Sequence, residues 1–211
     1  MKTILLTGFE PFGGDSLNPS EEVARQLSGA EIARHRVAGG LLPCVFGAAL
    51  KELKHLIKVH EPVLVVCLGQ AGGRTEITPE RVAINVDDAR IADNAGQQPV
   101  DRPVVKDGPA AYWSTLPIKA IVQALRRRGI PAAVSQTAGT FVCNHVFYGL
   151  MHELQSRPGV RGGFIHLPYL PEQAAGQPSL PFERMCAGVR LALETAVAYR
   201  RDVRAAGGQT N

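Results

Sequence analysis

Several features that define specialised classes of protein are missing from this 211-residue chain. No uninterrupted apolar run approaches the roughly 20 residues of a membrane-spanning helix, so we expect no insertion in a bilayer. The four cysteines are scattered, without a C-x-x-C pair or the Cys/His spacing of zinc sites, so we expect reduced thiols and neither a metal nor a cofactor. The formal net charge is +4, yet no basic stripe with interleaved aromatic residues occurs, which argues against nucleic-acid binding.

The amino-terminal segment lacks two further signatures. Residues 1–8 are too short for the apolar region of a secretory signal and have no small-residue cleavage site, so we expect a first strand and a cytoplasmic protein. Residues 8–14, GFEPFGG, match neither a dinucleotide-binding fingerprint nor a lysine-bearing P-loop. Phe9 and Phe12 lie in this turn after a strand, where open α/β sheets bind ligands. A turn that packs two rings onto the core is an equal alternative.

What is present is a globular composition, 45% hydrophobic and 20% charged, in alternating patterns. Apolar runs typical of strands covered on both faces occur at residues 3–7, 63–68, 132–135 and 164–167. Helical spacing follows at residues 20–28, 48–59, 116–128, 143–155 and 182–199. Strands alternating with helices predict an α/β fold, a single-domain sandwich with a largely parallel central sheet. We expect this domain to span residues 1–200 and residues 201–211 to form a frayed tail.

Two segments depart from this alternation. Residues 81–87, RVAINVD, alternate with period two, which favours a less buried strand of the kind found in antiparallel pairs, so the sheet is expected to be mixed. Residues 88–109 are rich in Asp, Gln, Gly and Pro without periodicity. That composition indicates a long functional loop or an arm used in subunit contacts.

Cys143 is the most informative thiol. The apolar residues after it have the spacing of one buried helical face: Val146, Phe147, Leu150, Met151 and Leu154. Cys143 therefore lies at or near a helix start, where unpaired N–H groups and the helix dipole favour a thiolate and can bind an oxyanion. Cys44, Cys67 and Cys186 occupy apolar or amphipathic stretches typical of core thiols. Taken alone, a cysteine at a helix start is more often structural.

A nucleophilic cysteine needs a base within hydrogen-bond reach. His145 is two residues away on the same helix and faces elsewhere, and His152 lies two turns further on. His166 ends the apolar run of the next predicted strand, so the fold permits it to approach Cys143. A core histidine bonded to the backbone is an equal alternative on pattern alone. The 19 acidic residues leave the group that would orient the imidazole undetermined.

The chain resembles the pyroglutamyl-peptidase I (pyrrolidone-carboxylate peptidase) family of cysteine peptidases in segments that occur in the family's order. The match runs from residue 2 to about residue 195. The segments that carry it are residues 7–14 (TGFEPFGG), 18–19 (NP), 79–85 (PERVAIN), 88–94 (DARIADN), 114–117 (STLP), 138–144 (AGTFVCN) and 164–171 (FIHLPYLP). Ordered agreement of this kind is far more specific than any single motif.

The resemblance implies a catalytic triad of Glu80, Cys143 and His166, with Arg90 near the active site. It also implies a three-layer α/β/α sandwich, peptides with an N-terminal pyroglutamate as substrates, hydrolysis through a thioester, and a homotetramer. The residues that it places around the pyroglutamyl group are Phe9, Phe12, Phe141 and Val142 as walls, and Asn18 and Gln70 as groups that hold the lactam.

Small departures from the family pattern, at Ala92 and at residues 15–17, touch no implied catalytic group. Two rival functions remain open at this stage. A broader cysteine amidase or a phosphorolytic enzyme would keep the fold and change the leaving group. A non-catalytic binding protein would tolerate Cys143→Ala and would show no unusually reactive thiol.

Overall fold

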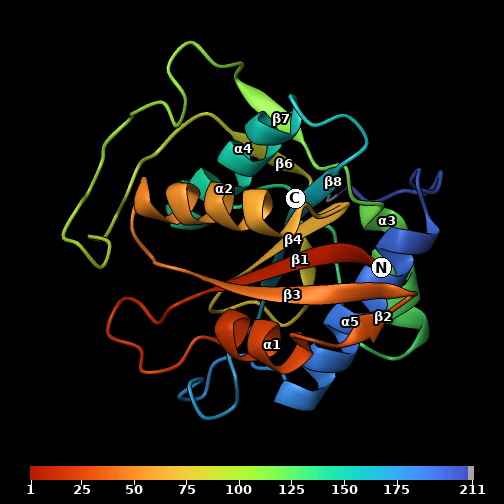
Figure 1. The fold of residues 1–211 in the computed structure, drawn as a ribbon. Helices are drawn as coiled ribbons and strands as arrows, with labels where there is room; N and C mark the ends of the chain where they lie inside the picture. Colours follow the sequence, from red (N-terminus) through yellow and green to blue (C-terminus); the bar gives the residue numbers. More distant parts are fainter. Residues whose placement is uncertain (209–211) are drawn as a thin grey trace.

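A computed structural model describes residues 1–208 of the chain, as a six-stranded sheet covered by helices on both faces (Figure 1). The strand order is β2-β3-β1-β4-β8-β5. The pairs β3–β1, β1–β4 and β4–β8 are parallel, whereas the short outer strands β2 and β5 are antiparallel to their neighbours. The bounds are β1 Lys2–Phe9, β2 Glu31–Ile32, β3 His35–Leu42, β4 Leu64–Gln70, β5 Thr78–Pro79 and β8 Arg161–Leu167. The predicted mixed, largely parallel sheet is confirmed.

The central strands are buried on both faces, as their unbroken apolar sequence predicts. Alternate residues point to opposite sides, so Leu6 and Val66 enter one core while Leu5 and Val65 enter the other. The sheet therefore separates two hydrophobic cores, and the three-layer arrangement is confirmed.

Five helices form the outer layers (Figure 1). Helices α1, α3 and α5 cover one face, and α2 and α4 cover the other. Their bounds are α1 Pro19–Leu27, α2 Ala48–His60, α3 Ile118–Arg127, α4 Val142–Leu154 and α5 Phe182–Ala198. All five agree with the predicted helices to within about two residues. Among the described residues, every helix is too short or too polar to cross a bilayer.

Three strand predictions need correction. Residues 132–135 form only isolated bridges, from Ala132 to Ile77 and from Ser135 to Glu80, on either side of the two-residue strand β5. The 81–87 segment yields β6 (Val82–Ile84), which pairs with β7 (Ala111–Trp113) in a separate two-stranded sheet instead of joining the central one. Strand β3 was missed, because its HRVAGGLL sequence lacks a continuous apolar run.

The carboxyl ends of β1, β4 and β8 meet at one edge of the sheet, since these strands are parallel. This edge carries Phe9, Gln70 and Leu167, and the loops that follow the strands gather there. It is the edge where open α/β sheets place ligands.

The segment expected to fray, residues 201–211, is described as far as residue 208. Asp202 accepts hydrogen bonds from the backbone N–H groups of Lys119 and Ala120, at 3.0 and 2.9 Å, in the first turn of α3. The Gly207 carbonyl accepts one from Arg81 at 2.7 Å. Residues 209–211 lie outside the described part of the chain.

The 88–109 segment is a loop that folds back on itself beside the first loop of the chain. Its base is closed by paired backbone hydrogen bonds between Asp87 and Arg102, at 2.7 and 3.0 Å. The Asn94 side chain donates to Glu10 and to the Pro11 carbonyl, at 2.8 and 2.9 Å. The loop therefore lies against the turn that carries Phe12.

Candidate active site

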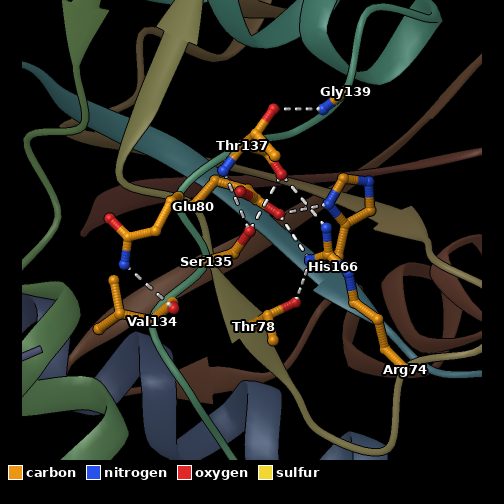
Figure 2. Close-up of polar contacts among 9 residues, drawn as sticks. Arg74, Thr78, Glu80, Val134, Ser135, Thr137, Gly139 and His166 are labelled. Atoms are coloured by element: carbon orange, nitrogen blue, oxygen red, sulfur yellow. Dashed lines mark hydrogen bonds and ion pairs between the residues drawn. The ribbon is translucent and has the colours of Figure 1, made fainter. Parts of the chain in front are cut away.

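A buried carboxylate–imidazole pair lies at the end of the sheet (Figure 2). Nδ1 of His166 lies 2.7 Å from Oε1 of Glu80, and the two side chains are 4% and 0% exposed. A carboxylate can only accept, so Nδ1 carries the proton and Nε2 presents its lone pair. The structure thus joins two residues that are 86 positions apart in the sequence.

The pairing of β5 with β8 brings these two residues together. Thr78 is in register with His166, and Pro79 with Ile165. The Glu80 N–H then donates to the Phe164 carbonyl at 2.9 Å, which fixes the backbone of Glu80 beside β8. The edge pairing therefore sets the position of the carboxylate, which local sequence alone does not reveal.

Glu80 is charged in spite of its burial. Burial raises the pKa of its carboxyl group, but the hydrogen bond and charge of His166, together with the Arg74 guanidinium, outweigh that effect and hold the pKa below its usual range. Arg74 Nη1 lies 2.8 Å from Glu80 Oε1. An ionised partner favours one tautomer and orientation of the imidazole.

Cys143 is the second residue of α4, as the apolar pattern predicts. Phe141, the residue before the helix, makes no capping hydrogen bond with its side chain. The first-turn N–H groups of a helix have no partner within the helix. They remain available here to an oxyanion that forms next to the sulfur.

Gly69 places the sulfur relative to the imidazole. A Cβ built on Gly69 would lie 3.0 Å from the Cys143 Sγ and 2.8 Å from the Phe164 ring, so only glycine leaves room for the thiol. Gly69 is in register with His166 on the adjacent parallel strand, so the thiol lies one strand from the imidazole on the same face. Among the described residues, the thiol and imidazole form no direct hydrogen bond, a separation common in substrate-free cysteine enzymes.

The environment of the thiol opposes its ionisation. Burial raises the pKa of Cys143 well above its usual range, Cys44 and Glu80 raise it further, and Arg74 lowers it. A base close to the sulfur therefore helps to remove the thiol proton during attack.

An aromatic cluster lines the approach to the helix start. The Phe141 ring lies 5.9 Å from that of Phe12 and 5.4 Å from that of Phe46, centroid to centroid. Phe9 is buried against Phe164 at 6.2 Å, and Val142 is fully buried beneath the cluster. The structure thus brings the predicted wall residues together and adds Phe46. Phe46 was not predicted because it lies in a turn, where neither helical nor strand periodicity marks a residue.

Asn18 and Gln70 occupy different environments. The Asn18 amide oxygen accepts from the Ser20 N–H and hydroxyl, at 3.0 and 2.7 Å, while its amide nitrogen donates to the Glu10 carbonyl at 3.1 Å. Both polar atoms of Asn18 are engaged in shaping the first loop. Gln70 ends β4 and is 8% exposed, with its nitrogen donating to Asp15 at 2.8 Å.

The Gln70 amide has a defined orientation. Asp15 can only accept, so the Gln70 oxygen faces the other way, and it receives one hydrogen bond from Gln173 at 3.1 Å. A carbonyl oxygen has two lone pairs, so one remains for a ligand N–H. Arg90 is exposed at the start of the long loop, next to the buried Ala89.

A second buried carboxylate–imidazole pair was missed from the sequence. Nδ1 of His145 lies 2.8 Å from Oδ2 of Asp87, and Nε2 accepts from the Gly47 N–H at 3.0 Å. The His145 ring packs edge-on against Phe46 at 5.4 Å. The helical spacing correctly separated His145 from Cys143, but it carried no information about a partner from the loop at Asp87.

An α/β sandwich with a thiol at a helix start and a carboxylate–imidazole pair on the adjacent strand has the architecture of a cysteine hydrolase. A family model described as pyroglutamyl peptidase matches residues 2–199. Two pyrrolidone-carboxylate peptidases are similar along their whole length. The one from Cupriavidus necator is 60% identical, with 99% of each chain covered, and the one from Klebsiella pneumoniae is 61% identical, with all of each chain covered.

Solved structures agree with these relatives. Pyroglutamyl peptidase I from Bacillus amyloliquefaciens superposes with a TM-score of 0.94 at 50% identity, over 96% of this chain and 100% of that one. Pyrrolidone carboxyl peptidase from Thermococcus litoralis gives a TM-score of 0.95 at 39% identity, over 98% and 100%. The chain belongs to the pyroglutamyl peptidase family.

Proposed function

We propose that this chain hydrolyses the amide bond after an N-terminal pyroglutamyl residue of peptides, with Cys143 as nucleophile, His166 as base and Glu80 as the group that orients it. The observation that carries the proposal is the Glu80–His166 pair at 2.7 Å, one strand from the Cys143 Sγ and on the same face. Membership of the pyroglutamyl peptidase family supports the substrate class.

The first half of the reaction forms a thioester. Nε2 of His166 takes the proton from the Cys143 thiol as the sulfur attacks the pyroglutamyl carbonyl, because burial raises the pKa of that thiol and a nearby base favours its ionisation. The N–H groups at the start of α4 bind the oxyanion of the tetrahedral intermediate. The C–N bond then breaks, and the imidazolium gives its proton to the departing amine.

The second half regenerates the enzyme. A water molecule gives one proton to Nε2 of His166 as its oxygen attacks the thioester carbon. The C–S bond breaks, the sulfur recovers that proton from His166, and pyroglutamic acid leaves. Glu80 keeps the proton on Nδ1 and stabilises the imidazolium in both halves, as the acid does in a Ser–His–Asp triad.

Selection of the substrate follows from the neutrality of the lactam. The partly exposed rings of Phe12 and Phe141 provide an apolar wall for a compact uncharged ring, and the buried Phe9 and Val142 belong to the core against which they pack. The free lone pair of the Gln70 oxygen accepts the lactam N–H. A prolyl ring presents a charged amine and no lactam carbonyl, so polar partners would be left unpaired and a charge would be desolvated.

The other candidate residues have supporting roles. Asn18 shapes the first loop through its hydrogen bonds with Ser20 and Glu10, and the second N–H of its amide is left to hold the lactam carbonyl. Arg90 is exposed on the long loop, two residues after Asp88, whose N–H donates to the Thr140 carbonyl before α4, and family resemblance supports a place for it near the substrate. The four free cysteines of the described residues support a reducing compartment and so a place in the cytoplasm. Its similarity to the family supports a homotetramer, which sedimentation equilibrium would test.

The proposal is tested by release of a fluorescent amine from a pyroglutamyl amide under reducing conditions, with prolyl and glutaminyl amides as controls. Wild type should cleave only the pyroglutamyl amide. Cys143→Ala should lose activity by at least roughly 10³-fold, because no other group can form the thioester. Cys67→Ala is the matched control, since Cys67 is a buried thiol in β4 outside the proposed chemistry.

Four outcomes would overturn parts of the proposal. Activity that survives Cys143→Ala would remove the thioester mechanism. Equal cleavage of prolyl amides would favour a broader amidase, and dependence on phosphate would favour a phosphorolytic enzyme. Absence of any wild-type cleavage would favour a binding protein.

A further inference from the structure

Arg74 occupies the centre of the polar network around the buried carboxylate (Figure 2). It lies in the turn after β4, and its Nη1 donates to Oε1 of Glu80 at 2.8 Å and to the Thr78 hydroxyl at 2.6 Å. Its Nη2 donates to the Thr137 carbonyl at 3.2 Å. One side chain therefore joins the turn after β4, the edge strand β5 and the loop that leads to α4.

The same oxygen of Glu80 receives both Arg74 and His166. The other oxygen, Oε2, is buried without a hydrogen-bond partner among the described residues. Burial of a carboxylate is costly unless the charge is paired. Arg74 is 29% exposed, so it supplies a permanent positive charge at a smaller cost of desolvation than a fully buried cation would carry.

Thr137 connects the network to the nucleophile. Its hydroxyl accepts from the Gly139 N–H at 3.0 Å, and Thr140 then contacts the long loop through the Asp88 carbonyl at 2.6 Å. This stretch runs directly into Phe141 and the start of α4. A displacement of the Thr137 carbonyl would thus be transmitted to the sulfur.

We propose that Arg74 is a positioning residue for the hydrolytic reaction: it holds the Glu80 carboxylate in line with His166 and anchors the loop that places Cys143. This inference rests on the proposed function. Arg74 acts through Glu80 and the Thr137 carbonyl, and it does not take part in proton transfer.

The charge of Arg74 acts in the same direction on the carboxyl group of Glu80 and on the thiol of Cys143. The titratable groups around this network are His166 on β8, Glu80 after β5, Cys143 on α4, Cys67 on β4 and Cys44 in the loop before α2. The Arg74 guanidinium lowers the pKa of Glu80 and of Cys143, so its removal raises both pKa values. The acid limb of the pH–activity profile, where activity falls as the pH is lowered, therefore moves to higher pH without Arg74, whether Glu80 or Cys143 controls it.

Three variants separate charge, geometry and folding. Arg74→Met removes the charge and the hydrogen bonds, and Arg74→Lys keeps the charge but has a single nitrogen that cannot fork between Glu80 and Thr137. Arg81→Met is the matched control, because Arg81 holds the same loop through Gln136 at 2.8 Å but does not contact the carboxylate. Circular dichroism and thermal unfolding verify that each variant is folded.

We expect Arg74→Met to lower kcat by roughly 10- to 100-fold with a small change in KM, as for a displaced catalytic group. Its acid limb should move to higher pH. Arg74→Lys should keep the wild-type acid limb while kcat recovers only in part, and Arg81→Met should keep both. A folded Arg74→Met with wild-type kcat and pH profile, or equal effects at Arg74 and Arg81, would overturn the proposal.

A second readout needs no substrate. The rate of Cys143 alkylation by iodoacetamide, followed by mass spectrometry of its peptide, should rise with pH in wild type and should require higher pH in Arg74→Met. If wild type fails to cleave pyroglutamyl amides but the alkylation profile shifts, the proposed substrate is wrong and the role of Arg74 holds. If cleavage is confirmed and neither profile shifts, the role of Arg74 is wrong.

Discussion

Two buried carboxylate–histidine pairs flank the same cysteine, and only one of them suits catalysis. Glu80–His166 and Asp87–His145 have almost equal lengths, 2.7 and 2.8 Å, and both use Nδ1. They differ at the other nitrogen. Nε2 of His145 accepts a backbone hydrogen bond from Gly47, whereas Nε2 of His166 has no partner among the described residues.

The pairs also differ in their charge balance. Glu80 has Arg74 beside it, at 2.8 Å, while no salt bridge other than that with His145 involves Asp87 in the described chain. The comparison teaches that a short carboxylate–imidazole contact does not define a catalytic base. A catalytic base also needs a free second nitrogen that can reach a nucleophile.

Replacing each histidine by glutamine should produce the largest contrast. The amide of Gln can accept from the Gly47 N–H in place of His145, but it cannot take up a proton in place of His166. We expect His166→Gln to lower kcat/KM by roughly 10³-fold or more, and His145→Gln by less than about tenfold. Steady-state cleavage of the pyroglutamyl amide measures both. Similar losses in the two variants would remove the distinction between the pairs.

Neutralising each carboxylate should separate activity from stability. Glu80→Gln should lower kcat by roughly 10²- to 10⁴-fold, because the imidazole loses the partner that fixes its tautomer. Asp87→Asn should leave most activity but lower the free energy of unfolding by about 1–3 kcal/mol, because a buried hydrogen bond is weakened. Urea unfolding and steady-state kinetics of both variants measure the contrast, and a catalytic defect confined to Asp87→Asn would reverse it.

The smallest effect concerns acid stability. The pKa of Glu80 in the folded chain is held below its ordinary value of 4.5, so its charge stabilises the native state above that pH. This contribution is lost as the pH falls through the lowered pKa. Wild type should therefore lose more stability than Glu80→Gln between pH 6 and acid pH, measured by the midpoint of urea unfolding. If the midpoint of urea unfolding changes with pH in the same way in both proteins, the charge of Glu80 does not contribute to the pH dependence of stability.

The regular parts of the fold were predictable because each is defined locally. Continuous apolar runs identified β1, β4 and β8, and helical spacing identified the five helices and the position of Cys143. Strand β3 was not predicted because Gly39 and Gly40 interrupt its apolar pattern. Gly39 has a packing reason that only the structure shows: a Cβ there would lie 2.7 Å from that of Ser28.

The site was predictable only in part. Residue patterns led to Cys143 and left His166 as one of two alternatives, and Glu80 came from family resemblance alone. Its partner, His166, lies 86 residues away, and the periodicity of a sequence carries no information about contacts between residues so far apart. Arg74 and Phe46 were missed because each lies in an irregular segment without periodicity. Arg74 meets Thr78 and Glu80 nearby in the chain and Thr137 far from it, while Phe46 meets Phe141 and His145 at the start of α4.

The short strand β5 also has a consequence for how activity returns on refolding. It contributes two residues, Thr78 and Pro79, at the end of the strand order, yet its pairing with β8 places Glu80 beside His166. A chain whose central strands have paired but whose β5 edge has not docked would therefore lack the Glu80–His166 pair. Under the proposed mechanism, recovery of peptidase activity would report the docking of this edge in addition to the formation of the core.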